Sequence, residues 1–125
     1  MSDVLLLIGA IYNLAFIVFH LLFWRIFDWR NDLVSLTATN RAIMQVLNLS
    51  LSFAFIIFGT LSFLFPQQMV ETKLGRALTG MIAAFWLLRA FEQIVFFKLK
   101  HWLSQLFTLV FLVGAGLYGL ILVGR

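Results

Sequence analysis

Seven polar side chains within strongly apolar segments or directly beside one are the residues best suited to hold a ligand. They are His20, Arg41, Gln45, Asn48, Arg89, Glu92 and Gln93. Steps of four and three along residues 41–48 place three of them on one helical face. Arg89 precedes Glu92 and Gln93 by three and four residues, within helical reach. Because ionisable groups in apolar segments are rare and commonly functional, we expect Arg41 and Arg89 to hold an anionic group, with Glu92 orienting Arg89.

Other site chemistry has weaker support in this sequence. The chain has no cysteine, and only His20 and Glu92 lie deep in apolar segments as potential ligands, so we predict no metal site. It contains no nucleophile motif of the G-x-S-x-G type, no phosphate-binding loop and no dinucleotide fingerprint, so we assign no catalytic residue. A b-type haem takes histidine ligands, and a haem-binding subunit with His20 as a ligand stays an alternative. His101 falls in a short turn and is expected at the headgroups.

Composition and the lengths of the apolar runs place these residues in a membrane. Hydrophobic residues make up 63% of the 125-residue chain and charged residues 11%, whereas about a quarter of a soluble domain is charged. Four runs have the ~20 residues needed to cross the hydrocarbon core, where backbone groups must be paired within a helix. We predict an all-α polytopic membrane protein, an antiparallel four-transmembrane-helix bundle in a single domain, 1–125. The expected spans are about 4–24, 42–65, 78–97 and 103–123.

The first span is expected to be retained as a transmembrane helix. It starts with Met1-Ser2-Asp3, an acidic rather than basic flank, and no small-residue cleavage motif precedes Arg25.

The connections between spans carry their own signals. Trp29, Leu33 and Leu36 recur at helical spacing, which fits a short amphipathic helix in the headgroup region, although an irregular loop fits equally well. Thr39 or Asn40 is the expected N-cap of the second span. The single proline, at position 66, is expected to end that span. The short third connection makes the last two spans antiparallel neighbours.

The positions of the polar residues predict that they meet. All seven lie within a few turns of the first and third connections, so we expect one polar cluster inside the bundle that opens toward that face. Polar side chains also cross-link helices in lipid for ~0.6 kcal/mol each. A purely structural cluster is therefore the alternative to a ligand site.

The distribution of basic residues predicts an orientation and a partner. The first and third connections carry five (Arg25, Arg30, Arg41, Lys98 and Lys100), and the opposite face carries Lys73, Arg76 and Arg125. The positive-inside rule then places the first and third connections in the cytoplasm, where Trp24, Trp29 and Trp102 would form an interfacial belt. The net charge of +4 is expected to meet anionic lipid headgroups rather than nucleic acid.

The last span carries small residues in place of charges. Ser104, Thr108, Ala115 and Gly119 lie near one face, and small residues let helices approach closely. Packing within the bundle is one use of this face, and a homodimer through Ala115 and Gly119 is the other.

The sequence resembles a group of short, uncharacterised bacterial four-helix membrane proteins. The resemblance rests on Asp28-Trp29, Leu33, Leu36 and the run 40–44, together with His20 and the run Phe85-Trp86-Leu87-Leu88-Arg89-Ala90-Phe91-Glu92-Gln93. It covers most of the chain and implies a bacterial inner-membrane location. It implies no activity.

Three functions follow as hypotheses. The first is a non-catalytic membrane protein that binds a small molecule, a lipid headgroup or a partner at the polar cluster. The second is a proton-coupled small transporter that acts as a dimer, with Glu92 as the titrating group. The third is the haem-binding subunit.

Overall fold

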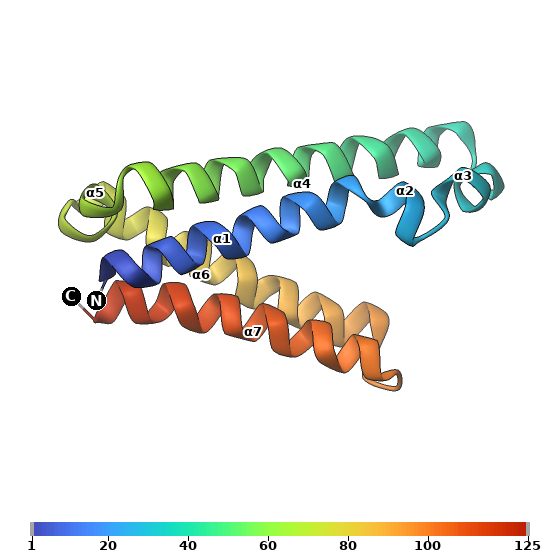
Figure 1. Cartoon of the computed structure of the whole chain (residues 1–125). Coiled ribbons are helices and arrows are strands. Elements are labelled where there is room, and N and C mark those ends of the chain that lie inside the picture. Colours follow the sequence, from blue (N-terminus) through green and yellow to red (C-terminus); the bar gives the residue numbers. More distant parts are fainter. Residues whose placement is uncertain (1, 125) are drawn as a thin grey trace.

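Residues 2–124 are described by a computed structural model in which all regular secondary structure is helical (Figure 1). Arg125, which entered the charge count above, lies outside the described residues. The elements in chain order are α1 (Ser2–Leu21), α2 (Phe23–Ile26), α3 (Trp29–Asp32), the 3₁₀ turn η1 (Leu33–Ser35), α4 (Ala38–Leu64), α5 (Pro66–Glu71), α6 (Lys73–Glu92), the π turn η2 (Gln93–Phe97) and α7 (Trp102–Val123).

Four of these stretches are long and apolar enough to cross a membrane within the described part of the chain: 2–21, 38–64, 73–97 and 102–123. They correspond one to one with the expected spans. The second and third begin four and five residues earlier than expected, because each starts at a threonine cap outside its apolar run. The first ends three residues earlier, since a break at Leu22 separates α1 from α2.

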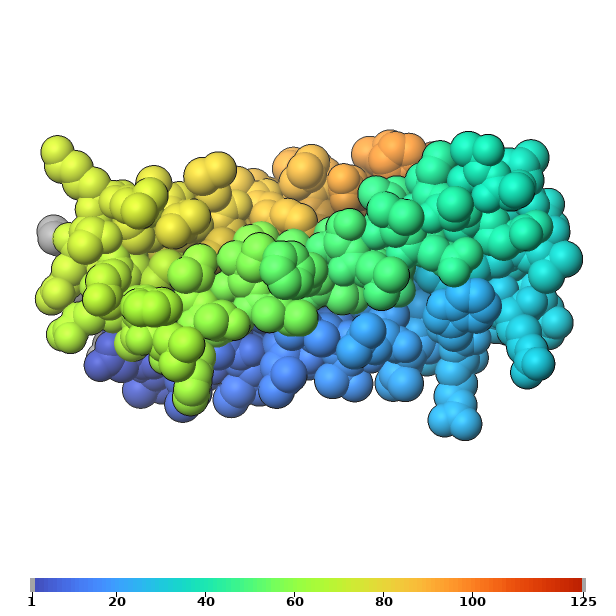
Figure 2. Space-filling model, turned by 90° about the horizontal axis from the view of Figure 1, so that it is seen from above, coloured from blue at the N-terminus to red at the C-terminus, as the bar shows by residue number. Residues whose placement is uncertain are grey.

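The long helices form two antiparallel hairpins. Helix α1 pairs with α4, α6 pairs with α7, and α1 also contacts α7. The expected pairing of the last two spans is therefore confirmed. Figure 1 shows the two hairpins close together near α5 and diverging toward α3. In Figure 2, α4 lies in front, with α1 on one side and α6 on the other. We call the two ends of the bundle the α3 end and the α5 end.

Aromatic rings fill the space between the hairpins. The Trp86 ring is fully buried and lies parallel to Phe55 of α4, at 5.2 Å between centroids, and to Phe111 of α7, at 5.9 Å. Phe16 of α1 completes the group at 4.9 Å from Trp86. Aromatic pairs of this kind add ~0.5–1.5 kcal/mol beyond the area they bury. These rings therefore join all four long helices in one core.

The first connection is helical rather than irregular. Trp29 and Leu33 are buried, at 7% and 3% exposure, and Leu36 is half-buried, while the charged residues between them are exposed. The amphipathic spacing thus predicted the turns of α3 and η1 correctly. The expected cap of the second span was wrong: Thr37, not Thr39 or Asn40, is the N-cap of α4, and its hydroxyl accepts from Asn40 N at 3.2 Å.

The second connection is compact because two residues fit it closely. As expected, Pro66 follows the end of α4, and it also starts α5 at a position where no backbone N–H is needed. Thr72 then caps α6 by accepting from Gly75 N at 2.9 Å. A Cβ at Gly75 would overlap the Gln68 carbonyl. The absence of a side chain at Gly75 therefore permits the close approach of α5 to α6.

The small residues of α7 divide between the bundle interior and its outer surface. Ser104, Thr108 and Gly114 are buried, and Gly114 leaves room for the Tyr12 hydroxyl of α1. A Cβ at Gly116 or Gly119 would meet nothing within 4 Å. Packing inside the bundle thus explains only some of the small residues of α7.

Candidate functional site

Arg89 lies at the α3 end of α6 and is held by residues of the same hairpin. Its Nη2 donates to Gln93 Oε1 at 3.1 Å, and Gln93 Nε2 donates to Ser104 Oγ of α7 at 3.2 Å. Ser104 Oγ in turn donates to the Lys98 carbonyl. This chain of bonds connects Arg89 to the turn between α6 and α7, and we call Arg89, Gln93 and Ser104 the Arg89 group.

The turn itself is built by two backbone features. Residues 93–97 form a π turn, a rare geometry that is frequent at functional sites. Lys98 then takes a positive φ of 63°, which ends the helix and exposes its carbonyl to Ser104. His101 caps α7 by accepting from Leu103 N at 3.2 Å, and it is exposed, as expected for a residue outside the apolar run.

The Arg89 guanidinium rests on aromatic faces instead of a carboxylate. Its central carbon lies 4.4 Å from the centroid of Phe111 and 5.7 Å from that of Phe97. Cation–π contacts are worth ~2 kcal/mol when desolvated. Glu92 is half-buried one turn away, but within the described residues Arg89 forms no ion pair with a carboxylate. Arg89 therefore has no directly bonded carboxylate, although the Glu92 carboxylate attracts its charge from a distance.

His20 and Asn48 form a reciprocal pair between α1 and α4. His20 Nδ1 lies 2.8 Å from Asn48 Oδ1, and Asn48 Nδ2 donates to the His20 carbonyl at 3.1 Å. With the amide placed this way, Oδ1 is the acceptor and the ring proton is on Nδ1. The imidazole also stacks on Phe23, at 4.3 Å between centroids. Both residues are thereby fixed within one hairpin.

The other residues predicted on α4 bond to local backbone. Gln45 Nε2 donates to the Arg41 carbonyl at 3.2 Å. The Arg41 guanidinium turns toward the first connection, where it donates to Leu33 O at 2.9 Å, Leu36 O at 3.1 Å and Val34 O at 3.3 Å. These contacts tie the first connection to α4.

The seven predicted residues thus form separate groups. Hydrogen bonds join His20 to Asn48 and Arg89 to Gln93, and among residues 2–124 none crosses between the two pairs. The side chains between them are aromatic: Phe55 lies 5.2 Å from the His20 ring and 5.2 Å from Trp86, which stacks on Phe111 beneath Arg89. The arrangement favours Arg89, rather than a shared cluster, as the place where an anion would bind.

A buried polar network nearer the α5 end was missed by the sequence reasoning. Asn13 Nδ2 donates to the Tyr118 hydroxyl at 2.9 Å, and that hydroxyl lies 2.7 Å from Ser62 Oγ. All three side chains are essentially inaccessible, and they join α1, α7 and α4. Asn13 shares a helical face with His20 and Trp24, but its partner Tyr118 lies 105 residues away in the sequence. No spacing within one segment reveals such a contact.

Among the described residues, no group of three or more His, Asp or Glu side chains is arranged to hold a metal ion. Comparisons with family models, curated proteins and solved structures gave no significant match.

Proposed function

We propose that this chain is an integral membrane protein of four spanning helices that binds an anionic group at Arg89 and carries out no reaction on it. The apolar outer surface supports the membrane part of the proposal. Large side chains such as Leu49, Phe53 and Phe63 are about 61% exposed, and a surface of this kind would aggregate in water. Lipid is therefore its natural solvent.

The lack of a directly bonded carboxylate at Arg89 is the observation that carries the proposal. Arg89 lies about two turns before the end of the membrane-length stretch 73–97, which combines α6 and η2. An arginine inside such a span costs ~2.5–3.5 kcal/mol even on the mildest scale. The partners of Arg89 are an amide and two aromatic rings. These leave several of its five N–H donors free to bind two oxygens of an anion at once. A phosphate or carboxylate would supply a directly bonded negative charge.

The surroundings of Arg89 favour a lipid headgroup as the source of that anion. Lys98 and Lys100 follow on the same end and are exposed. Basic residues near an anionic leaflet contribute ~1 kcal/mol each. The positive-inside count favours a cytoplasmic location for this end, and the resemblance noted above favours a bacterial inner membrane.

The contacts of His20 support a structural role for that residue. Its ring is bonded to Asn48 and stacked on Phe23, so its position is explained by joining α1 to α4. The proposed site therefore consists of Arg89 and includes neither His20 nor proton transfer through Glu92.

A comparison of lipid binding by the wild-type protein and by the variant Arg89→Gln tests the proposal. Wild-type protein in mild detergent is titrated with phosphatidylglycerol, with phosphatidylcholine of the same chains and with inorganic phosphate, and bound species are counted by native mass spectrometry. We expect phosphatidylglycerol to bind roughly fivefold tighter than phosphatidylcholine, the preference that one arginine gives, and we expect Arg89→Gln to lose it. Binding of inorganic phosphate alone would identify a soluble anion as the ligand.

Arg25→Gln is the matched control, because this exposed arginine lies in the first connection outside the Arg89 group. A folded Arg89→Gln variant that keeps the wild-type preference, or one that is merely less stable, would show that Arg89 serves packing only.

A further inference from the structure

An apolar groove runs along the outer surface between α1 and α4. Its volume is about 470 Å³, within the range of sites that hold small molecules. Ala10 and Gly59 let the two helices approach here, since a Cβ at Gly59 would already contact Ala10 O at 3.6 Å. The bulky, exposed Leu14 and Phe63 rise from the two helices beside this small-residue strip. The groove therefore has apolar walls.

The groove has the length of one leaflet. Along α1 it extends from Leu7 to Ile17, which is ~15 Å at 1.5 Å per residue. The hydrocarbon core of a bilayer is ~30 Å thick, so the groove spans about half of it. On α4 the groove residues run from Ile56 to Phe63, in the half of that helix nearer the α5 end. An acyl chain of a lipid in that leaflet spans the same depth.

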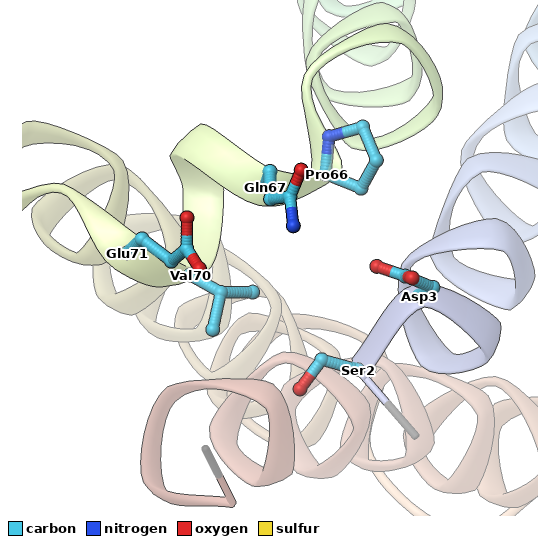
Figure 3. Close-up of a pocket in the computed structure, with 6 residues that line it drawn as sticks. All are labelled: Ser2, Asp3, Pro66, Gln67, Val70 and Glu71. Atoms are coloured by element: carbon cyan, nitrogen blue, oxygen red, sulfur yellow. The ribbon is translucent and has the colours of Figure 1, made fainter.

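A polar hollow of about 220 Å³ lies at the α5 end, beyond the apolar groove. Asp3 is one helical turn before Leu7 on α1, so it continues the row of groove residues on that helix. Gln67 lies on α5, which begins directly after α4 ends. Figure 3 shows Asp3 of α1 and Gln67 of α5 facing each other across the hollow, with Glu71 on the far side. Two carboxylates, an amide and the Ser2 hydroxyl therefore surround it.

From this arrangement we infer a second lipid site: the α1–α4 groove holds one acyl chain of a lipid whose headgroup carries a primary ammonium, and Asp3 and Glu71 receive that ammonium. Carboxylates complement a cation, and a primary ammonium also donates hydrogen bonds to them. The leaflet is opposite to that of Arg89, so this site is independent of the proposed function.

Charge also argues against a second copy of the chain as the occupant. Two copies related by a twofold axis along the bundle would place the same patch of each against the other. Their Asp3 carboxylates would then lie near each other, and like charges repel.

The decisive comparison is between two zwitterionic lipids with identical chains, phosphatidylethanolamine and phosphatidylcholine. Neither carries the net negative charge that Arg89 is proposed to recognise, so the outcome does not depend on that proposal. We expect the ethanolamine lipid to bind wild-type protein roughly three- to tenfold tighter by native mass spectrometry, the range that two exposed ion pairs provide. The double variant Asp3→Asn/Glu71→Gln should bind both lipids equally.

Filling the groove separates the chain site from the headgroup site. Thr60 is exposed and lines the groove, so Thr60→Trp should weaken binding of both lipids severalfold. Ser50→Trp, at an exposed position of α4 that lines neither the groove nor the polar hollow, should leave binding of both lipids unchanged. Circular dichroism confirms that each variant is folded.

Three results would overturn the inference. They are equal affinity of the wild type for the two lipids, unchanged binding by Thr60→Trp, or occupation of the groove by a second copy. The third result is measured with the variant Ile11→Cys, in which the new cysteine is the only one in the chain. If a second copy occupied the groove, this variant would form a disulfide-linked dimer efficiently in bilayers.

Discussion

Replacing Tyr118 with phenylalanine tests whether the buried network fixes the relative positions of α1, α4 and α7. The change keeps the ring, and with it the packing, but removes the hydroxyl. Two contacts go with it, the one at 2.9 Å from Asn13 and the one at 2.7 Å with Ser62. Interhelical hydrogen bonds in membrane proteins contribute ~0.6 kcal/mol on average and at most ~1.7.

The remaining partners limit the loss. Asn13 Nδ2 keeps its bond to the Gly9 carbonyl, and Ser62 Oγ keeps its bond to the Phe58 carbonyl. Neither group is left entirely without a bond, so the full penalty for an unpaired buried group does not apply. We expect Tyr118→Phe to lower the free energy of unfolding by ~1–2 kcal/mol, about two average bonds.

Reversible unfolding in mixed detergent micelles, followed by far-ultraviolet circular dichroism, gives this quantity. Tyr12→Phe is the matched control: its hydroxyl donates one bond, to the Val110 carbonyl at 2.8 Å, so it should lose about half as much. A double-mutant cycle of Tyr118→Phe with Ser62→Ala should give a coupling above ~0.5 kcal/mol. An effect of Tyr118→Phe no larger than that of Tyr12→Phe, with zero coupling, would refute the reasoning.

Three further changes test the local contacts. Gly75→Ala should lower the thermal stability in detergent by the equivalent of ~1–3 kcal/mol, since the new Cβ meets the rigid Gln68 carbonyl; Gly116→Ala, which meets nothing, should be neutral or stabilising. Asn48→Ala should lower stability by ~1–2 kcal/mol and release the fixed His20 tautomer, which nitrogen NMR of the imidazole detects. Arg41→Lys should speed hydrogen exchange of residues 29–37 but not of α6 or α7, because an ammonium lacks the fork that bonds three carbonyls.

Each of these has a contrary result. Equal thermal stabilities of the two glycine variants would mean that α5 and α6 can separate without cost. An unchanged imidazole spectrum in Asn48→Ala would mean that a residue other than Asn48 fixes the His20 tautomer. Uniform hydrogen exchange in Arg41→Lys would mean that Arg41 does not hold the first connection.

Local spacing was enough to predict the helices and some of the contacts within them. The four long helices follow from apolar runs of sufficient length, and the turns of α3 and η1 follow from Trp29 and Leu33. Arg89 bonds to Gln93 because residues four apart on a helix are neighbours, whatever the helix packs against. Glu92 was expected to orient Arg89, but within the described residues it forms no hydrogen bond or ion pair with it, because residues three apart on a helix can make contact without having to.

Contacts between helices depend on how each helix is rotated against its neighbours. The positions of the apolar runs in the sequence do not reveal that rotation. Helical periodicity groups residues on a face but does not say which face meets which, and a helix that is apolar all round has no polar side to mark its outer face. The tertiary structure alone brings Asn13 to Tyr118 and Ser62, pairs His20 with Asn48, and puts aromatic rings between that pair and Arg89. It also brings Asp3 of α1 and Gln67 of α5 to the same polar hollow. Membrane-spanning length and local turns were thus determined by the sequence, while the sites between helices were decided by packing.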